Sequence, residues 1–588
     1  MFLRATQRTK NGKVHRYWSV VESRRRANGR PVQKTLLYLG ELNDSQHAGW
    51  CRTIDGSVGN VEAPLALFPS DRTPPPGLPA VQIRMDRLSL HRPRQWGACW
   101  LAMVLWNQLR LDEFWGPLLP PSREGTSWLN VLKTLTAYRL IDPGSEWRLH
   151  RLWYEHSAMA DLLDEDFGVV AKDTLYRCLD KLVEHKAALF DHLKERWSDL
   201  FGAKFEILLY DLTSTYFECD APQGEHGGLR RHGYSRDKRP DCVQVVIALI
   251  VTPDGFPMAY EVMKGNTADN TTLSDFLATI EQQYGKAGRI WIMDRGIPTE
   301  ETLAQMRQSP TPVQYLVGTP KGRLSQLEQS FLEQDWQRAK DNVQVKLHAA
   351  GEELYVLALS DDRVQKERSM RRRKLKKLWK RLHDLKRMRQ TREELLMRLG
   401  AARKEAGQTW SLVDIETQGE FTFRLNTTKL RQARSREGRY LLRTNLTAQD
   451  PAQLWKLYIQ LTEIEQVFKD LKNDLGLRPI HHQTDERIQA HIFVAFLSYC
   501  LLVTLKARLR RHAGGLTPRS VIEQLKAIQM LDVKAPTTDG RALTLTRYTQ
   551  PDAAQQLILA RLGLTLPPQP PPKITDSSAS NHAAVVKT

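Results

Sequence analysis

Between residues 205 and 320, short apolar runs alternate with segments of helical character. A short apolar run bounded by polar or turn residues is typical of a strand buried on both faces of a sheet. The turn Pro253-Asp254-Gly255 separates two such runs and predicts a hairpin. In chain order we expect strands at 207–210, 243–251, 258–262, 290–293 and 314–318, with helices at 271–284 and around Leu303.

The resulting order, β-β-β-α-β-α-β, is that of a ribonuclease H-like core, so we expect an α/β fold whose first part spans 205–320. A second part is expected at 448–515, where the run 492–506 is apolar enough to form a buried helix. Residues 321–447 lie between the two parts and are interpreted as an insertion domain. They contain a long basic helix with a leucine seam, which suits either a DNA-binding arm or a solvated helix packed by one thin stripe.

The flanking regions differ in composition. Residues 1–63 predict a small basic β-containing unit, and 64–90 have the proline content of a linker. Residues 91–204 predict a helical region, in which a leucine stripe fits either a DNA-binding unit or plain core packing. Residues 516–566 are expected to be helical, and the tail 567–588 is expected to be disordered.

The charge of the chain narrows the choice of partner. The 588 residues carry a formal net charge of +19, which favours a polyanion such as nucleic acid over an anionic membrane surface. No run approaches the roughly 18 apolar residues of a membrane span, and the N-terminus lacks the apolar core of a signal peptide. The six cysteines are scattered singly, without zinc or disulfide spacing, so we expect a cytoplasmic protein with reduced thiols.

Two of the predicted strands run into an aspartate. Asp211 follows the run 207–210, and Asp294 follows the run 290–293. An acidic residue at the carboxyl end of such a strand lies in the crevice where α/β sheets bind their ligands. Two neighbouring carboxylates of this kind can share divalent cations, as two-metal phosphoryl transfer requires. Oxygen ligands suit Mg²⁺, and no phosphate-binding loop of the GxxxxGK[ST] type indicates nucleotide hydrolysis.

A third carboxylate, Glu465, lies in a basic amphipathic segment that we expect to be a single helix. Tyr458, Leu461, Glu465, Phe468 and Lys472 recur at helical spacing and would lie near one face. Taken alone, this segment is equally consistent with an ordinary amphipathic helix held by salt bridges. The two upstream aspartates favour the interpretation of Glu465 as a metal ligand beside phosphate-binding groups.

Together these residues resemble the DDE transposases of bacterial insertion sequences, in the group with a Tyr-x2-Arg-x3-Glu-x6-Lys signature. Tyr458, Glu465 and Lys472 match the signature at its spacing, whereas Leu461 occupies the arginine position. The resemblance covers residues 10 to 510 and points to the long-chain subgroup. It extends to the stretches 12–14, 39–41, 211–218, 294–298, 438–445 and 477–482.

The resemblance implies a mechanism and a set of partners. Asp211, Asp294 and Glu465 would be the catalytic residues and would hold two Mg²⁺ ions, with Mn²⁺ able to substitute. Water would cut the DNA at the element's ends, and the freed 3′-OH would attack target DNA. Tyr458 and Lys472 would contact DNA phosphates, and Lys469 or Arg478 would replace the missing arginine. The active complex would be a homodimer on double-stranded DNA, associated with the bacterial nucleoid.

Two other classes of function stay open at this point. One is a site-specific nuclease or resolvase on the same fold, and the other is a DNA-binding repressor whose carboxylates are structural. The insertion and the segment with Tyr458 and Lys472 favour a transposase, because a simple hydrolase needs neither.

Overall fold

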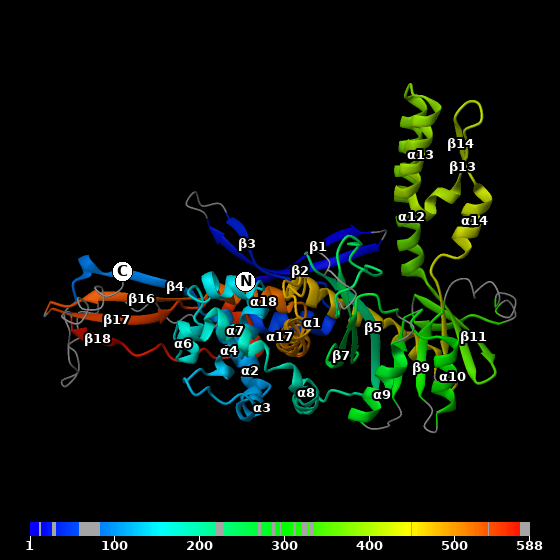
Figure 1. Cartoon of the computed structure of the whole chain (residues 1–588). Helices are drawn as coiled ribbons and strands as arrows, with labels where there is room; N and C mark the ends of the chain where they lie inside the picture. Colours follow the sequence, from blue (N-terminus) through cyan, green and yellow to red (C-terminus); the bar gives the residue numbers. More distant parts are fainter. Residues whose placement is uncertain are drawn as a thin grey trace.

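The computed structural model combines one large mixed sheet, a helical region, two smaller sheets and a projecting arm (Figure 1). It describes residues 1–10, 13–25, 31–57, 83–218, 228–268, 272–284, 289–294, 296–309, 313–319, 327, 331, 334–340, 342–448, 450–538 and 540–576.

The large sheet has nine strands in the order β10-β11-β12-β15-β9-β8-β5-β6-β7. Five of these strands and two helices carry the order expected from the sequence, β-β-β-α-β-α-β. β8 and β9 have the predicted bounds, whereas β5 runs on well beyond its apolar start. The elements are β5 (Ile207–Tyr216), β6 (Gln244–Val251), β7 (Pro257–Lys264), α9 (Leu273–Tyr284), β8 (Ile290–Met293), α10 (Glu300–Gln308) and β9 (Gln314–Gly318).

Both faces of this sheet are buried, which explains its continuous apolar runs. Leu208 and Tyr210 pack with side chains of α9 and α10 in one core cluster. Leu209 points to the opposite face, in the cluster that includes α17 (Asp485–His512). α17 is long and apolar enough to cross a membrane, but 94% of its apolar window is buried inside the structure. It is therefore the buried helix that the run 492–506 predicts.

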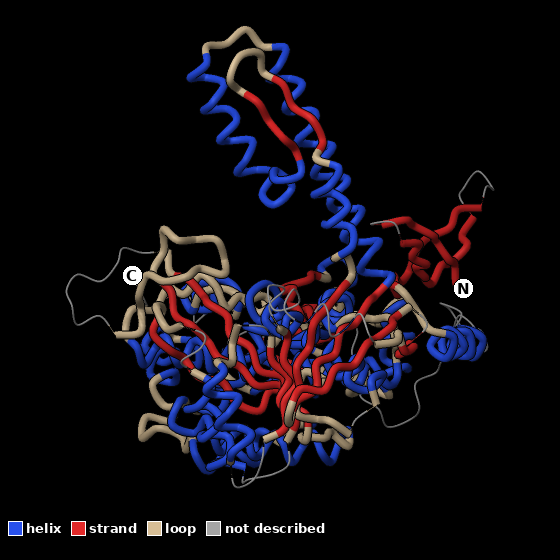
Figure 2. Tube along the Cα trace, turned by 90° about the vertical axis from the view of Figure 1, so that its right-hand side faces the viewer, coloured by secondary structure: helices blue, strands red, loops and turns tan. Residues whose placement is uncertain are grey.

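The segment between β9 and the second part of the core both widens the sheet and builds the arm (Figures 1 and 2). Four strands extend the sheet: β10 (Gln337–Lys340), β11 (Val343–Ala350), β12 (Glu353–Ser360) and β15 (Arg439–Thr444). The arm consists of α12 (Asp361–Arg387), α13 (Arg392–Ala406), the hairpin β13 (Val413–Glu416) and β14 (Thr422–Leu425), and α14 (Thr427–Ser435). The predicted seam is present, since Leu378, Leu382 and Leu385 are buried in the core of the arm.

The N-terminal unit is a three-stranded antiparallel sheet followed by a helix. The β-containing unit expected at 1–63 is confirmed: β1 (Phe2–Lys10), β2 (Lys13–Arg25) and β3 (Pro31–Gly40) form the sheet, and α1 (Asp44–Ser57) follows. Most of the linker expected at 64–90 lies outside the described residues.

The expectation of a helical C-terminal region is wrong in part. Between α18 (Pro518–Lys526) and α19 (Ala553–Leu562), the chain forms β16 (Gln529–Pro536) and β17 (Arg541–Tyr548). These strands join β4 (Ser89–Gln95) and β18 (Lys573–Asp576) in a four-stranded sheet, which the sequence analysis had assigned to linker, helix and tail. Their partners are remote in sequence: buried Arg94 bonds Asp532 at 3.1 Å. Residues 577–588 of the expected tail are outside the described part of the chain.

The helical region packs against the core through α4 (Trp128–Ile141) and α17. Its other main helices are α2 (Gly97–Gln108), α3 (Leu111–Leu118), α7 (Lys172–Leu179) and α8 (Lys186–Phe201). Its leucine stripe, Leu175, Leu179 and Leu182, is fully buried, in agreement with the core-packing alternative.

Candidate active site

Asp211 and Asp294 are brought together by the register of two parallel strands. β5 pairs with β8 from Ile207 opposite Ile290 to Tyr210 opposite Met293, and each aspartate is the next residue. Neighbouring strands lie about 4.8 Å apart, so the two carboxylates leave the sheet at one edge. The expectation that the first strand ends before Asp211 is wrong: β5 continues along β6 to Tyr216, and it is β8 that ends.

Glu465 comes from α16 (Leu461–Lys469), which packs on β5. The single helix expected over 458–472 is in fact three pieces. α15 (Pro451–Ile459) ends before Gln460, α16 follows, and residues 470–474 form a π-helical turn. Ile464, Val467 and Phe468 bury the apolar side of α16, which leaves Glu465 exposed on the opposite side.

The three carboxylates line one cavity of about 400 Å³. The pKa of Asp211 is raised to about 7, chiefly by burial and in smaller part by the negative charges of Asp294 and Glu465. The hydrogen bond from the Leu212 amide, at 2.8 Å, and the charge of Arg236 act in the opposite direction. The carboxylates therefore lie close enough to repel one another, which is the electrostatic condition for holding divalent cations.

The donor set fits divalent cations such as Mg²⁺. All three side chains offer carboxylate oxygens, the ligands that hard cations prefer. The three carboxylates do not form a compact cage for one ion. Among the described residues, a group of His, Cys, Asp or Glu with all ligand atoms within 4.8 Å of one another is found at a different place, which is described below. Two ions about 3.5–4 Å apart, each about 2 Å from its ligands, would share the three carboxylates between them.

Tyr458 and Leu461 line the same cavity, and so do three cationic side chains that the sequence analysis did not assign to the site. The Tyr458 ring lies 5.9 Å from that of Tyr440. The cations are Arg363 and Lys366 at the start of α12 and Arg439 at the start of β15. Arg439 belongs to a stretch that supported the family resemblance, but no sequence signal connects Arg363 and Lys366 with the carboxylates.

The other expected DNA-binding residues lie away from this cavity. Lys472 and Arg478 both donate to Asp237 Oδ1, at 2.8 and 2.5 Å. Asp237 and Lys472 have only 5% and 10% of their side chains exposed, whereas Arg478 has 27%. Burial lowers the pKa of Lys472, and the hydrogen bond to Asp237 partly offsets this. Lys469 is exposed on α16 but does not line the cavity.

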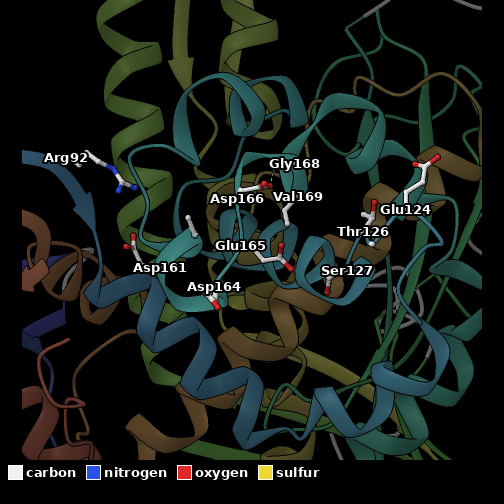
Figure 3. A pocket seen from close by; sticks show the side chains of 12 residues that line it. Arg92, Glu124, Thr126, Ser127, Asp161, Asp164, Glu165, Asp166, Gly168 and Val169 are labelled. Carbon is white, nitrogen blue, oxygen red and sulfur yellow. Dashed lines mark hydrogen bonds between the residues drawn. The ribbon is translucent and has the colours of Figure 1, made fainter. Parts of the chain in front are cut away.

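A second hollow, of about 690 Å³, lies in the helical region and is acidic (Figure 3). Asp161, Asp164, Glu165 and Asp166 line it. Three of these carboxylates have structural partners: Asp161 pairs with Arg94 at 2.7 Å, Glu165 accepts from Asn130 at 2.8 Å, and Asp166 accepts from the Gly168 amide at 2.7 Å. This face would repel a DNA backbone, so it does not support DNA binding by this part of the helical region.

Glu146, His482 and His491 form a compact buried group, with their potential ligand atoms within 4.8 Å of one another. The sequence shows no such cluster because Glu146 is remote from the two histidines. The guanidinium of Arg139 lies 3.4 Å from both Glu146 and His491, where it would repel a cation. We therefore interpret the group as an ion-pair network that joins the helical region to the loop after α16, where Arg139 also donates to the Gly476 carbonyl at 3.2 Å.

Two family models match the chain. The model described as Transposase DDE domain matches residues 219–501, and that of the IS1634 family transposase N-terminal domain matches residues 3–56. Asp294 and Glu465 lie inside the first match, and Asp211 lies just before it. No curated protein matches the chain. A solved structure, the piggyBac transposase synaptic complex with hairpin DNA, is 8% identical, with 72% of this chain and 79% of that chain covered. Its TM-score of 0.36 is too low to support an argument.

Proposed function

Because the chain belongs to the insertion-sequence DDE transposases, we propose that it binds the ends of its element, cleaves the DNA strands and joins the 3′ ends to target DNA. The main support for this proposal is that Asp211 and Asp294 lie side by side on neighbouring strands and line one cavity with Glu465. The strand order around this pair supports a ribonuclease H-like core interrupted by the arm-bearing segment.

The three carboxylates would hold two Mg²⁺ ions, which Mn²⁺ could replace. When bound, such ions neutralise charge on the reacting phosphate and lower the pKa of coordinated water. The protein's own contribution is position. Asp211 and Asp294 are fixed by strand register, and Glu465 by a helix whose apolar side is buried. The hydrogen bond from the Leu212 amide orients the Asp211 carboxylate.

DNA would lie across this edge of the sheet. Tyr458 lines the cavity and offers a hydroxyl to a phosphate. Lys469 is exposed nearby in sequence, and Lys472 and Arg478 share Asp237, with Arg478 the more accessible. We retain these residues as DNA contacts outside the cavity. We also propose a homodimer as the active complex, acting at the bacterial nucleoid, since each element has two ends.

The test is cleavage and joining of a DNA duplex that carries the sequence flanking the coding region. Asp211→Asn, Asp294→Asn and Glu465→Gln should each abolish cleavage and leave duplex binding intact. The matched control is Glu486→Gln, which removes an exposed carboxylate at the start of α17. Cleavage without joining would indicate a nuclease or resolvase, and binding without cleavage would indicate a repressor.

A further inference from the structure

The arm enters and leaves the sheet beside the active-site cavity. β12 ends at Ser360, where α12 begins, and β15 begins at Arg439, where the chain returns. The two strands are antiparallel neighbours, with Leu359 opposite Arg439. Residues at the two ends of the arm therefore meet at one place, which we call the arm root.

The arm root contributes three cations to the cavity that contains the carboxylates. Arg363, Lys366 and Arg439 line it together with Asp211, Asp294 and Glu465. Lys366 is exposed and Arg439 is half-buried. Within the described part of the chain, neither has an ion-pair or hydrogen-bond partner for its charge. Two unpaired cations facing a set of carboxylates indicate a ligand that carries its own negative charge.

The arm root is held rigidly. The Glu367 carboxylate accepts a hydrogen bond from Arg363 Nε at 2.9 Å and from the Gly438 amide at 3.0 Å. The Ser360 amide donates to the Gly438 carbonyl at 3.0 Å. Next to it, buried Glu437 accepts from Arg368 Nε at 3.1 Å and pairs with Arg371. Arg363 is thus fixed before any ligand binds, which reduces the entropy cost of binding.

Glycine is required at residue 438 for this close approach. Its φ is +71°, and an added Cβ would lie 2.3 Å from Val364 Cγ2 and 2.8 Å from the Ser360 carbonyl oxygen. The first turn of α12 and the start of β15 can pack together only because no side chain separates them. Arg363 and Lys366 therefore lie next to Arg439 at the cavity.

The residues of α16 that line the cavity include no cation. Leu461 lines it beside Ile464, and neither side chain can bind a phosphate. Lys472 and Arg478 are occupied by Asp237. Among the cationic side chains considered as DNA contacts, those at the arm root line the cavity of the carboxylates, whereas Lys469, Lys472 and Arg478 do not.

We propose that Arg363, Lys366 and Arg439 form a phosphate-binding rim that holds the DNA strand backbone beside the three carboxylates. This inference rests on the proposed function, because the ligand is the phosphodiester chain of the cleaved DNA. Arg439 presents a planar guanidinium suited to two phosphate oxygens, and Lys366 presents a compact charge. The rim offsets the repulsion between the DNA backbone and the carboxylates.

The experiment compares the full-length protein with Lys366→Gln/Arg439→Gln, using the duplex that carries the flanking sequence. The matched control is Lys376→Gln, an exposed lysine of α12 that does not line the cavity. We expect the double variant to cleave about 10-fold more slowly or worse, and the control to cleave normally. The slope of the logarithm of the binding constant against the logarithm of the salt concentration should become shallower by about 1.8, since each lost phosphate contact accounts for about 0.9.

Two further measurements separate phosphate binding from a structural role. The first uses a set of duplexes, each with one phosphate near the cut replaced by a neutral methylphosphonate. At one position, the replacement should slow cleavage by the unaltered protein but not cleavage by the double variant. Lys366→Arg/Arg439→Lys should restore most of the rate, since it keeps both charges. Unchanged cleavage by the double variant, or equal sensitivity of both proteins to every neutral phosphate, overturns the rim. Absence of cleavage by the unaltered protein overturns the proposed function, and the rim with it.

Discussion

Asp211 and Asp294 stand side by side because each follows the last residue of the parallel pairing between β5 and β8, where Tyr210 faces Met293. β5 continues along β6, and β8 stops. Leu209 and Ile292, two residues before the aspartates, belong to one core cluster, so both carboxylates point to that face of the sheet, where they line a cavity with Glu465.

The repulsion among the carboxylates predicts a coupling between divalent cations and stability. Asp211→Asn removes one charge from a partly buried anionic site, so the metal-free protein should become more stable, by about 1–3 kcal/mol. The same variant should lose most of the stabilisation that MgCl₂ gives the unaltered protein. Thermal unfolding with and without MgCl₂ measures both effects. Equal stabilisation of the two proteins by the salt would contradict a cation site at Asp211.

Glu146 should anchor the helical region to the core. Glu146→Gln leaves the buried Arg139 without its counter-charge, so we expect a loss of about 3–5 kcal/mol in the free energy of unfolding. Glu124→Gln, an exposed carboxylate of the same region, is the control and should cost little. Urea unfolding of the two variants would show whether the network contributes as its burial implies.

The contribution of Glu146 to stability should depend on pH. Burial alone would raise the pKa of Glu146, but His482, whose Nε2 lies 3.4 Å from the carboxylate, and the charge of Arg139 hold the pKa well below its usual range. A carboxyl whose folded pKa is lowered stabilises the protein above its unfolded pKa, and this stability is lost as the pH falls through the folded value. The difference in unfolding free energy between the unaltered protein and Glu146→Gln should therefore shrink only in strong acid. A difference that vanished already near pH 6 would contradict this.

Gly438→Ala should disrupt the arm root. The added methyl group would contact Val364 and the Ser360 carbonyl, and the residue would also keep a strained positive φ. Gly419→Ala provides the comparison, because Gly419 has a φ of +94° with nothing within 4 Å of the added Cβ. We expect Gly438→Ala to cost about 1–3 kcal/mol more than Gly419→Ala in denaturant unfolding. Similar costs would mean that the close approach contributes nothing beyond strain.

Lys472→Ala should lower both stability and the rate of end cleavage, because it leaves Asp237 buried with Arg478 alone. Adding Asp237→Asn replaces the buried carboxylate, which has lost one of its two cationic partners, by a neutral side chain and should restore about 1–3 kcal/mol of stability. A cleavage rate that stays low in the stable double variant would indicate a phosphate contact by Lys472. Recovery of both properties together would assign Lys472 a supporting role only.

Binding to the element's ends should weaken steeply with salt, because lysine and arginine contacts release counterions from DNA. The net charge of +19 motivates this expectation. A titration by gel shift between low and physiological salt measures it. An affinity that does not change over this range would count against nucleic acid as the main partner.

Local pattern predicted some of the elements around the site. The apolar runs at 290–293 and 314–318 match β8 and β9 because strands buried on both faces need apolar side chains throughout. The spacing of Tyr458, Glu465 and Lys472, together with the aspartates that follow two apolar runs, pointed to the family. These signals depend on neighbours a few residues apart, which the sequence displays directly.

Pairing between remote segments was decided only by the tertiary structure. β4 and β16 lie more than 400 residues apart, and their shared ion pair of Arg94 with Asp532 has no local trace. The division of the segment 458–472 into α15, α16 and a π-helical turn also has no signal in the sequence. Above all, Arg363 and Lys366 reach the carboxylates because β12 and β15 are neighbours in one sheet, and hydrogen bonding between distant strands is a property of the fold as a whole.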